Sequence, residues 1–280
     1  GIYYNVIDSV NNTVEVTYQG EKWDSYDEYS GQVVIPETVS CNGITYKVTE
    51  IGAYAFCRSQ NLTNVTVPLG VTTVNEYAFF RCDGLKSVDL PSSVTTIKEY
   101  AYHYCKGLTN VNFNEGLKTI YQYAFAYIEN LTTLELPASL DSLGSYVFLG
   151  CGALSEVTLN GNWDGSFSGS GPSFSKIAYG AVLYVNNKED FWPYFSSEFS
   201  IITEKGDLFE KGGIRYNVLD GNSVAIVSAK AANVYTGDFV VPETVVYSGK
   251  TYNVTRITGK AFLDCTELTG IKIHDKIESI

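Results

Sequence analysis

The sequence of 280 residues contains no methionine and only two histidines, His103 and His274. A chain without an initiating methionine is expected to be a processed or excised product. Two histidines so far apart leave little material for a histidine metal centre or a Ser/His/Asp triad. No apolar run approaches the roughly 18 residues that a membrane-spanning helix requires. We therefore expect neither a transmembrane segment nor a histidine-dependent centre in this chain.

Positive charge and catalytic motifs are also scarce. Lysine and arginine total 19 against 31 aspartates and glutamates, so the formal net charge is −12. Such a chain would on average repel nucleic acids and anionic membranes, and neither is expected as a partner. The sequence carries no G-x-S-x-G, no phosphate-binding loop, no H-E-x-x-H and no C-x-x-C pair. These absences predict that the chain is not an enzyme and holds no cofactor or metal.

Apolar and aromatic side chains, in contrast, are abundant and follow a repeat. Apolar residues make up 45% of the chain and include 22 tyrosines and 14 phenylalanines, enough for a packed core. Residues 51–159 hold five units of 23 residues, and a sixth begins near the end of the chain. Self-similarity at such a period is the signature of a solenoid. Position zero of the units is Ile51, Val74, Ile97, Ile120, Leu143 and Ile257.

The apolar positions inside a unit predict its shape. Position 4 is Ala55, Ala78, Ala101, Ala124 and Val147; position 5 is Phe56, Phe79, Tyr102, Phe125 and Phe148; position 11 is Leu62, Leu85, Leu108, Leu131 and Leu154. Position 14 is Val65, Val88, Val111, Leu134 and Val157, and position 16 is Val67, Leu90, Phe113, Leu136 and Leu159. Positions 4, 5, 8 and 11 have the spacing of a short helix, whereas positions 14 and 16 alternate with polar residues as a strand does.

One unit cannot bury its apolar face alone, so stacked units are expected, with their strands pairing in parallel along one side. The sequence thus predicts an α/β solenoid, a right-handed stack of 23-residue units that each contain a strand and a short helix. Strands are expected on one face and short helices on the other.

The segment VNEYAFFRCDGLKSVDLPSSVTTI, residues 74–97, resembles the BspA-type leucine-rich repeat nearly throughout. The resemblance implies a leucine-rich-repeat-like stack closed by β-hairpin caps. It departs from the better-known leucine-rich repeat, which places an asparagine after L-x-x-L-x-L. No asparagine ladder is expected, because that slot holds Gly70, Ser93, Gly116 and Ser139.

Residues 1–50 lie outside the repeat and predict an N-terminal β cap over the first coil. Alternating residues around Asn11-Asn12 and around Asn42-Gly43 predict two β-hairpins. The same block recurs, since GIRYNVLDGNSVAIVS repeats the opening and FVVPETVVYSGKTYNVTRITGKAF repeats residues 33–56. We therefore predict a second β cap at 213–256 and the start of a second, truncated repeat array at 257–280.

The segment 160–204, between the two arrays, begins with a Gly/Ser-rich excursion. Its end resembles the terminator of these repeat domains, which is a strand followed by a short helix with aromatic residues. In that interpretation the last coil is covered by Phe191, Trp192, Tyr194 and Phe195. Residues 205–212, KGDLFEKG, are expected to be a linker.

The stretch EYAYHYCKGL, residues 99–108, resembles a histidine and cysteine site with an aromatic wall. His103, however, takes position 6 of its unit, a variable and mostly apolar slot. His274 falls in a different unit, so the two histidines are not expected to meet. We interpret His103 as a large scaffold residue beside the core.

Four of the six cysteines take position 8, on the expected inward stripe: Cys82, Cys105, Cys151 and Cys265. Cysteine there behaves as a small apolar residue, and free buried thiols are the favoured interpretation. Two alternatives stay open, a disulfide between the neighbours Cys82 and Cys105 and one between Cys41 and Cys57.

Position 3 is a tyrosine in each of the first five units: Tyr54, Tyr77, Tyr100, Tyr123 and Tyr146. Such an aromatic ladder could bind sugars or proline-rich peptides. The structural alternative is that each ring packs on the next and closes the seam between coils, which the regularity favours.

Positions 13 and 15 flank the buried residue of each strand and point outward. These candidate binding residues are Asn64, Thr66, Ser87, Asp89, Asn110, Asn112, Thr133, Glu135, Glu156 and Thr158. Solenoids commonly use such a surface for partners, and its polar, mildly acidic character suits protein or glycan recognition. A plain solvated face is the alternative.

The resemblance implies a function that composition alone does not. BspA-like proteins are commonly exported by gut and oral anaerobes of the Bacteroides type, and some bind host matrix proteins. We expect an extracellular or surface-anchored adhesion module that binds a host or neighbouring-cell protein. A glycan-binding module for polysaccharide capture is the alternative, and a hydrolase with a carboxylate pair near Asp164 is a third hypothesis. The unfinished last repeat also suggests self-association.

Overall fold

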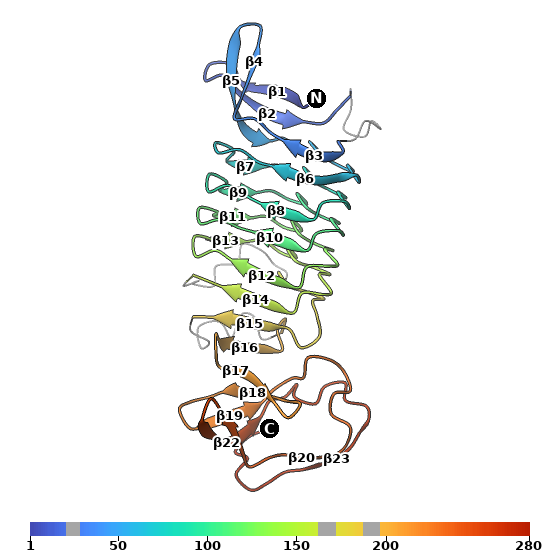
Figure 1. The fold of residues 1–280 in the computed structure, drawn as a ribbon, viewed down its shortest axis with the longest axis vertical. Coiled ribbons are helices and arrows are strands. Elements are labelled where there is room, and N and C mark those ends of the chain that lie inside the picture. Colours follow the sequence, from blue (N-terminus) through green and yellow to red (C-terminus); the bar gives the residue numbers. More distant parts are fainter. Residues whose placement is uncertain (21–28, 162–171, 187–196) are drawn as a thin grey trace. The chain divides into compact units, whose positions relative to one another are not determined.

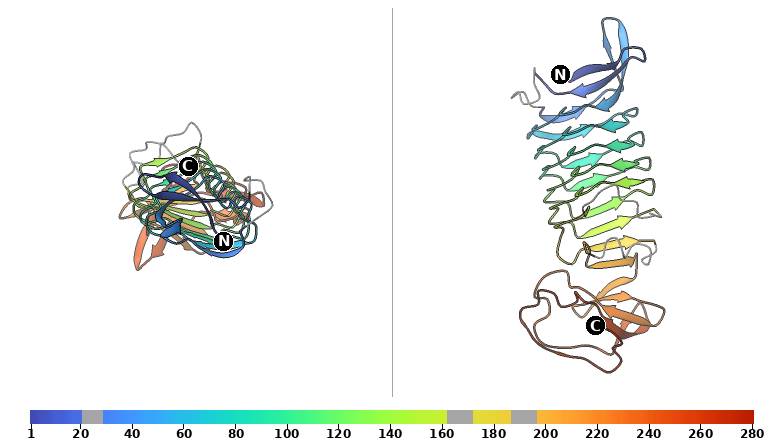
Figure 2. Two further views of the ribbon diagram at one scale, coloured as in Figure 1. Left: turned by 90° about the horizontal axis from the view of Figure 1, so that it is seen from above. Right: turned by 180° about the vertical axis from the view of Figure 1, so that it is seen from behind.

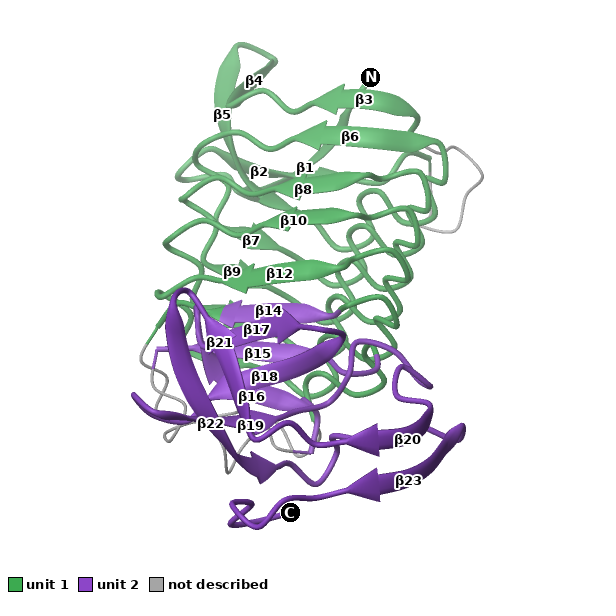
Figure 3. Ribbon diagram, turned by 60° about the horizontal axis from the view of Figure 1, so that its bottom comes forward, with its two compact units in different colours: residues 1–154, 159–178 green, residues 155–158, 179–280 purple. Residues whose placement is uncertain are grey.

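The computed structural model describes residues 1–20, 29–161, 172–186 and 197–280. The chain divides into two compact units (Figure 3). Residues 1–154 with 159–178 form the first unit, and residues 155–158 with 179–280 form the second. The secondary structure of the described ranges is built from strands and turns, and no helix occurs within them.

The coils of the first unit lie one above another, and each contributes a short strand to each of two rows (Figures 1 and 2). One row is a parallel ladder that continues from the cap, with equivalent residues paired 23 apart, such as Thr73 with Thr96. The sequence pattern did not predict this row. Its strands are β5 (Ile44–Ile51), β7 (Thr73–Val74), β9 (Thr96–Ile97), β11 (Thr119–Ile120) and β13 (Ser142–Leu143).

The other row contains the strands that the alternation at positions 13–16 predicts. They are β6 (Leu62–Thr66), β8 (Ser87–Asp89), β10 (Asn110–Asn112) and β12 (Thr133–Leu136). β8 and β10 pair in parallel, whereas β6 pairs with β3 (Gly31–Val34) of the cap. Within the described chain no ladder joins β6 to β8. The row is therefore interrupted, in contrast to the continuous parallel pairing that we expected.

The short helix predicted at positions 4–11 is wrong, because a compact run of turns stands there. The tyrosine at position 3 has a positive φ of 56° to 60° in all five coils. The residue at position 7 is also left-handed in every coil: Arg58, Arg81, Tyr104, Tyr127 and Gly150. A right-handed helix cannot continue through either position. The helical spacing of the apolar residues therefore marks the inner face of a tight turn.

The backbone amides of these turns alternate between two kinds of partner. In the first coil the amides of Ala55 and Cys57 donate to carbonyls three residues earlier, whereas those of Tyr54, Phe56 and Arg58 donate to the next coil. The same alternation recurs along the stack. An α-helix would direct all of these amides to its own segment. The bonds between coils thus replace a helix and tie each coil to its neighbour.

Columns of equivalent side chains fill the core of the stack, as the repeat predicts. The rings at position 5 stack with centroids 4.8–5.6 Å apart, and each is at most 1% exposed. Thiols at position 8 donate to the position 5 carbonyl of the preceding coil, from Cys82 to Phe56 and from Cys105 to Phe79. Core packing and bonds between coils therefore follow the same period.

Position 19 of the unit, for which no asparagine ladder was expected, alternates between glycine and serine. The residues at this position link the coils in pairs. Ser93 Oγ accepts a hydrogen bond from the amide of Gly70 and donates one to the carbonyl of Val71. Ser139 makes the same two bonds to the coil before it. One serine hydroxyl therefore satisfies two backbone groups of the preceding coil.

Both hairpins expected in the N-terminal block are present. β1 (Tyr3–Asp8) pairs antiparallel with β2 (Thr13–Thr17), and β4 (Thr38–Cys41) pairs antiparallel with β5. At the second turn, Asn42 and Gly43 have φ values of 52° and 79°, the left-handed pair of a type I′ turn.

The block closes the first coil through Tyr29. Its ring packs on Phe56 with centroids 4.7 Å apart, and its hydroxyl donates to the carbonyl of Thr17 at 2.9 Å. A buried ring and a satisfied hydroxyl thus join the cap to the ladder at position 5.

The end of the Gly/Ser-rich excursion returns to the stack and covers the fifth coil. The amides of Tyr146 and Phe148 donate to the carbonyls of Pro172 and Ser173. Phe174 is fully buried and stacks on Phe148 with centroids 5.1 Å apart, so it adds one more ring to the ladder at position 5. These residues act as a degenerate coil, which the interruption of the 23-residue pattern concealed.

The second unit contains a parallel sheet, a mixed sheet and a pair of strands. The parallel sheet holds β14 (Glu156–Leu159), β15 (Val182–Val185) and β16 (Ile201–Glu204). The mixed sheet runs in the order β17 (Leu208–Lys211), β18 (Ile214–Val218), β19 (Ser223–Ile226), β22 (Lys250–Ile257) and β21 (Thr244–Tyr247). β20 (Gly237–Val240) pairs with β23 (Leu268–Lys272). The segment that we expected to be a linker, 205–212, thus contains a strand.

The duplication in the sequence is also a structural one. β18, β19, β21 and β22 pair with the same directions as β1, β2, β4 and β5, including a bulge in the parallel pair. Asp220 accepts the amides of its turn as Asp8 does. Tyr235 packs against Phe262, just as Tyr29 packs against Phe56. Only β17 has no counterpart among the described residues of the first copy.

Candidate functional site

The ten candidate binding residues lie on strands, but the structure does not bring all of them into one unit. Eight lie on β6, β8, β10 and β12 of the first unit, and each is partly or fully exposed. The residue between each outward pair on β8, β10 and β12 is buried: Val88, Val111 and Leu134. Glu156 and Thr158 lie on β14, in the second unit.

Three of these residues form a linked polar group on β8 and β10. Asn112 donates from Nδ2 to Oδ1 of Asp89, which lies directly opposite on the neighbouring strand. Ser87 donates from Oγ to the other carboxylate oxygen of Asp89 at 3.3 Å. A carboxylate has about four lone-pair sites, so Asp89 can accept further bonds from a ligand. The bonds from Ser87 and Asn112 hold the Asp89 carboxylate in one orientation, which sets the direction of those further bonds.

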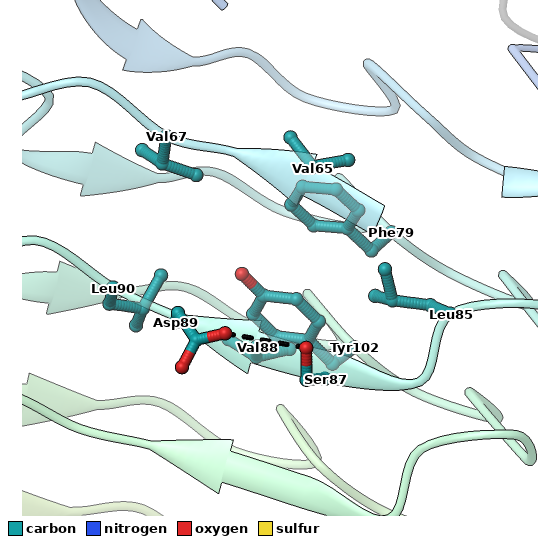
Figure 4. Close-up of a pocket in the computed structure, with 9 residues that line it drawn as sticks. All are labelled: Val65, Val67, Phe79, Leu85, Ser87, Val88, Asp89, Leu90 and Tyr102. Atoms are coloured by element: carbon teal, nitrogen blue, oxygen red, sulfur yellow. Dashed lines mark hydrogen bonds between the residues drawn. The ribbon is translucent and has the colours of Figure 1, made fainter. Parts of the chain in front are cut away.

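A small recess opens beside this group, at the break between β6 and β8 (Figure 4). Its empty volume is about 220 Å³, part of it open solvent. The lining is mainly apolar and includes Val65, Val67 and Leu90, with Ser87 and Asp89 at β8. Strands that do not pair leave this opening, and it gives the polar face one apolar contact point.

The Tyr102 hydroxyl points into the space between the two strands (Figure 4). Tyr102 is the one tyrosine among the position 5 rings, and burial raises the pKa of its phenol well above the ordinary value. The recess therefore presents a neutral hydroxyl among apolar side chains, which can bond a polar atom that enters it.

The five tyrosines at position 3 stack in a continuous column. Successive centroids are 4.9–5.3 Å apart, and the planes differ by 1° to 21°. Burial, followed by the neighbouring phenols, raises the pKa values of Tyr77 and Tyr100. At this spacing each inner ring face is covered by the next ring. A ligand could meet the ring edges and hydroxyls along the column, or a ring face at its two ends.

His103 lies in an aromatic cage, although its slot is mostly apolar in other coils. Its ring stacks on Phe80 at 5.6 Å and meets the ring of Tyr104 edge-on at 4.4 Å. The rings of Tyr100 and Tyr127 are 5.2 and 5.6 Å away. The side chain is only 9% exposed, and Nδ1 is buried without a hydrogen-bond partner.

The cage keeps His103 neutral. Burial lowers the pKa of its imidazole to about 4, and the positive charge of Arg81 adds to the effect. The guanidinium of Arg81 lies over the rings of Phe80 and Tyr104, at 5.5 and 5.4 Å from their centroids. A neutral histidine enclosed in this way is a poor proton donor at neutral pH and supports the scaffold interpretation.

All six cysteines are free thiols, so neither of the two disulfides left open is present. Cys82, Cys105 and Cys151 are buried and each donates to a backbone carbonyl. Burial raises the pKa of all three thiols, which disfavours the reactive thiolate. Cys41 is exposed at its hairpin turn and Cys57 is buried.

Some expected features lie outside the described residues. These are Asp164 and the aromatic terminator Phe191, Trp192, Tyr194 and Phe195. Within the described ranges, no group of three or more His, Cys, Asp or Glu side chains could hold a metal ion. The same ranges contain no helix long and apolar enough to cross a membrane.

Sequence reasoning missed the recess and the cage for a shared reason. The break between β6 and β8 is a property of strand pairing, which the residue pattern of a unit does not encode. The cage draws on positions 3, 6 and 7 of adjacent coils, and only a register of stacked turns brings those positions together. A useful signal was present in the two departures from pattern, Tyr102 for phenylalanine and His103 for an apolar residue.

The family comparison agrees with the repeat. A family model for the BspA type leucine rich repeat region matches six copies, over residues 44–168 and 248–280. The match covers more than half of the chain. No curated protein matches the sequence.

Three similar solved structures are of bacterial proteins. The leucine rich cell surface protein of Faecalibacterium prausnitzii A2-165 is 24% identical with a TM-score of 0.55, covering 99% of this chain and 77% of that one. A leucine rich repeat protein of T. pallidum is 26% identical with a TM-score of 0.48, covering 56% of this chain and 68% of that one. The pneumococcal vaccine antigen PcpA is 16% identical with a TM-score of 0.45, covering 99% and 69%. The likeness to the F. prausnitzii protein shows a shared leucine-rich-repeat fold.

Proposed function

Because the chain belongs to the BspA-type leucine-rich repeat family, we propose that it is a protein-binding or adhesion module exported to the cell surface. In this proposal right-handed coils present the polar row of β6, β8, β10 and β12 to a host or neighbouring-cell protein. The family, whose repeats serve recognition, and the surface location of the F. prausnitzii protein support the proposal. We assign the chain no catalytic reaction.

The observation that carries the proposal is the fixed polar group of Ser87, Asp89 and Asn112 beside an apolar recess. Protein interfaces combine an apolar anchor point with oriented polar groups around it. The inward positions of β8, β10 and β12 are buried, whereas the outward positions of these strands are partly or fully exposed. The acidic charge of the chain, −12, favours a partner with basic groups at the contact.

Glycan binding is the second candidate. Asn110, Asn112 and Asp89 offer amides and a carboxylate on adjacent strands, a set that can bond to sugar hydroxyls. The tyrosine column supports this candidate less well, because its ring faces are occupied by one another.

Binding to a panel of matrix proteins and to a glycan array, with the same preparation of the whole chain, tests the proposal. The test variant is Asp89→Ala with Asn112→Ala, which removes a bond between coils on the proposed face. The matched control is Lys118→Ala with Asp141→Ala, which removes an exposed ion pair of 3.5 Å between coils elsewhere.

We expect at least a tenfold loss of protein binding in the test variant and none in the control. Binding to glycans alone would select the second candidate. Equal losses in both variants, or no loss in either, would reject this face as the binding surface.

A further inference from the structure

The hydroxyl of Tyr102 has no hydrogen-bond partner among the described residues. Its ring is stacked between Phe79 and Phe125 in the ladder at position 5, and the side chain is only 1% exposed. Figure 4 shows this hydroxyl pointing into the recess between β6 and β8. A buried hydroxyl without a partner is unfavourable, so a polar atom that enters the recess gains a hydrogen bond there.

The phenol distinguishes this recess from the other interruption of the strand row. Within the described chain no ladder joins β10 to β12 either. The residue of the repeat that corresponds to Tyr102 at that second interruption is Phe148, which has no hydroxyl. A polar group at the floor of the opening is therefore specific to the recess between β6 and β8.

The carboxylate of Asp89 gives the recess a negative charge that no described lysine or arginine balances by an ion pair. Its two bonds come from the neutral donors Ser87 and Asn112, so each oxygen keeps a lone pair for a further donor. Three other carboxylates of the stack each have a lysine of an adjacent coil within 4 Å: Glu76, Glu129 and Asp141. Asp89 is thus available to a positive group from outside the chain.

The remaining walls of the recess suit an aliphatic chain. Val65 and Val67 line it on the β6 side and Leu90 on the β8 side. A lysine side chain normally lays its methylenes along such apolar surface and directs its ammonium to a polar group. The ammonium carries three donors and a positive charge, so it can bond to the phenol of Tyr102 and to the carboxylate of Asp89 together.

Other ligand groups fit this combination less well. An anion would be repelled by Asp89, and a purely apolar side chain would leave the Tyr102 hydroxyl without a partner. A neutral hydroxyl could bond to Tyr102 but would gain little from the charge of Asp89. The planar guanidinium of arginine favours two parallel acceptors, whereas each oxygen of Asp89 already accepts one bond.

We propose that the recess binds the side chain of a lysine presented by the protein partner. Its methylenes lie on Val65 and Val67, and its ammonium donates to the hydroxyl of Tyr102 and to the carboxylate of Asp89. The inference rests on the proposed function and names the residue type that the polar row recognises. The net charge of −12 draws a partner with lysines at its contact surface toward this site.

The test is an NMR titration of the whole nitrogen-15-labelled chain with Nα-acetyl-lysine methylamide, followed at the backbone amides of Val65 and Val88. We expect saturable shifts at both amides. Nα-acetyl-norleucine methylamide has the same aliphatic chain without the charge, and should bind at least about tenfold more weakly. The arginine analogue should also bind more weakly than the lysine analogue, because its fork does not match the acceptors.

Two variants of the chain test the two polar contacts. Asp89→Asn keeps the shape of the side chain and removes its charge, so it should weaken binding of the lysine analogue at least about tenfold. Tyr102→Phe keeps the stacked ring and removes the hydroxyl, and should weaken binding at least about threefold. The matched control is Asp141→Asn, an exposed carboxylate just before β13, which should leave binding unchanged.

The proposal is overturned if the lysine analogue causes no saturable shift, or if the norleucine analogue binds equally well. It is also overturned if Asp89→Asn binds the lysine analogue as tightly as the unaltered chain. Should Tyr102→Phe fail to fold, Asp89→Asn and the comparison of the two analogues decide. Loss of matrix-protein binding in the variant with Asp89→Ala and Asn112→Ala, without binding of the lysine analogue, would retain the proposed function and reject the lysine site alone.

Discussion

The ring of Tyr127 lies against the backbone of Gly150, one coil further along the stack. A Cβ added to Gly150 would stand 2.6 Å from Cδ1 of that ring, and the φ of Gly150 is 72°. Other coils carry arginine or tyrosine at this left-handed position, so the conformation alone does not require glycine. The neighbouring ring does, because it takes the space of the missing side chain.

Gly150→Ala should therefore destabilise the first unit by about 1–3 kcal/mol, since it adds backbone strain and displaces the Tyr127 ring. Urea denaturation followed by tyrosine fluorescence measures the change. Gly152→Ala is the matched control, because a Cβ there meets nothing within 4 Å and should cost less than about 0.5 kcal/mol. Equal effects at the two glycines would refute the role of the ring contact.

Phe174→Ala should lower stability by about 3–5 kcal/mol, because it empties a fully buried ring site on the fifth coil. Tyr102→Phe is the comparison inside the same ladder. It keeps the ring and removes only the hydroxyl, so a change below about 1 kcal/mol is expected. Thermal unfolding of both variants shows whether the Phe174 ring closes the repeat array or only belongs to a loop that packs beside it. A small loss on Phe174→Ala would favour the latter.

His103 should make the fold less stable as the pH falls from about 6.5 to about 4. The pKa of its imidazole is lowered to about 4 by burial and by Arg81, whereas the unfolded histidine takes up a proton near pH 6.5. Within that window the unfolded chain binds more protons, so acidification favours unfolding. We expect a contribution of about 1–2 kcal/mol after solvent screening.

Replacement of His103 by phenylalanine, the residue type at the same position of the preceding coil, isolates this contribution. His103→Phe should reduce the loss of stability between pH 7 and pH 4.5, measured by urea denaturation at both values. Carboxylates titrate in the same range, so the difference between the variant and the unaltered chain is the relevant quantity. His274→Gln, a histidine of the second unit, serves as the control and should leave the His103 contribution in place. An unchanged pH slope in His103→Phe would contradict the cage as its cause.

Thiol labelling should divide the cysteines by burial. Native protein treated with iodoacetamide should be modified fastest at the exposed Cys41, and Cys82, Cys105 and Cys151 should react only in denaturant. Burial both blocks access and raises the pKa of these three thiols. Peptide mass mapping counts the labelled sites. A reductant should not change the melting temperature, and any drop would reveal a disulfide that contradicts the free thiols.

The repeat made the core predictable in detail. Equal spacing of Ile51, Val74 and Ile97 fixed which side chains face inward, because stacked units bury equivalent positions together. The hairpin at Asn42-Gly43 was also evident, since few residues adopt a left-handed pair of turn conformations. The structure was thus predictable from the sequence wherever a residue type fits only one kind of position, such as the buried face of a coil or a left-handed turn.

The turn at positions 3–8 was not predictable in this way. The spacing of Ala55, Phe56 and Leu62 fits a helix and a tight turn equally well, and the decision rests on the left-handed Tyr54. Tyrosine has no intrinsic preference for that conformation. It is stabilised by the stacked column and by amide bonds to the next coil, both of which exist only after the units have stacked. The recess likewise depends on which strands pair.

The alternating amides of the turn have an evolutionary consequence. A backbone bond between coils joins residues about one period apart, as Phe56 joins Ala78. Loss or gain of exactly 23 residues leaves every such partner in register, whereas a change of one residue misaligns all the columns at once. The length of the repeat array can therefore change only in steps of one 23-residue coil. Recombination within the gene can lengthen or shorten the stack by whole coils while the caps at its ends stay the same.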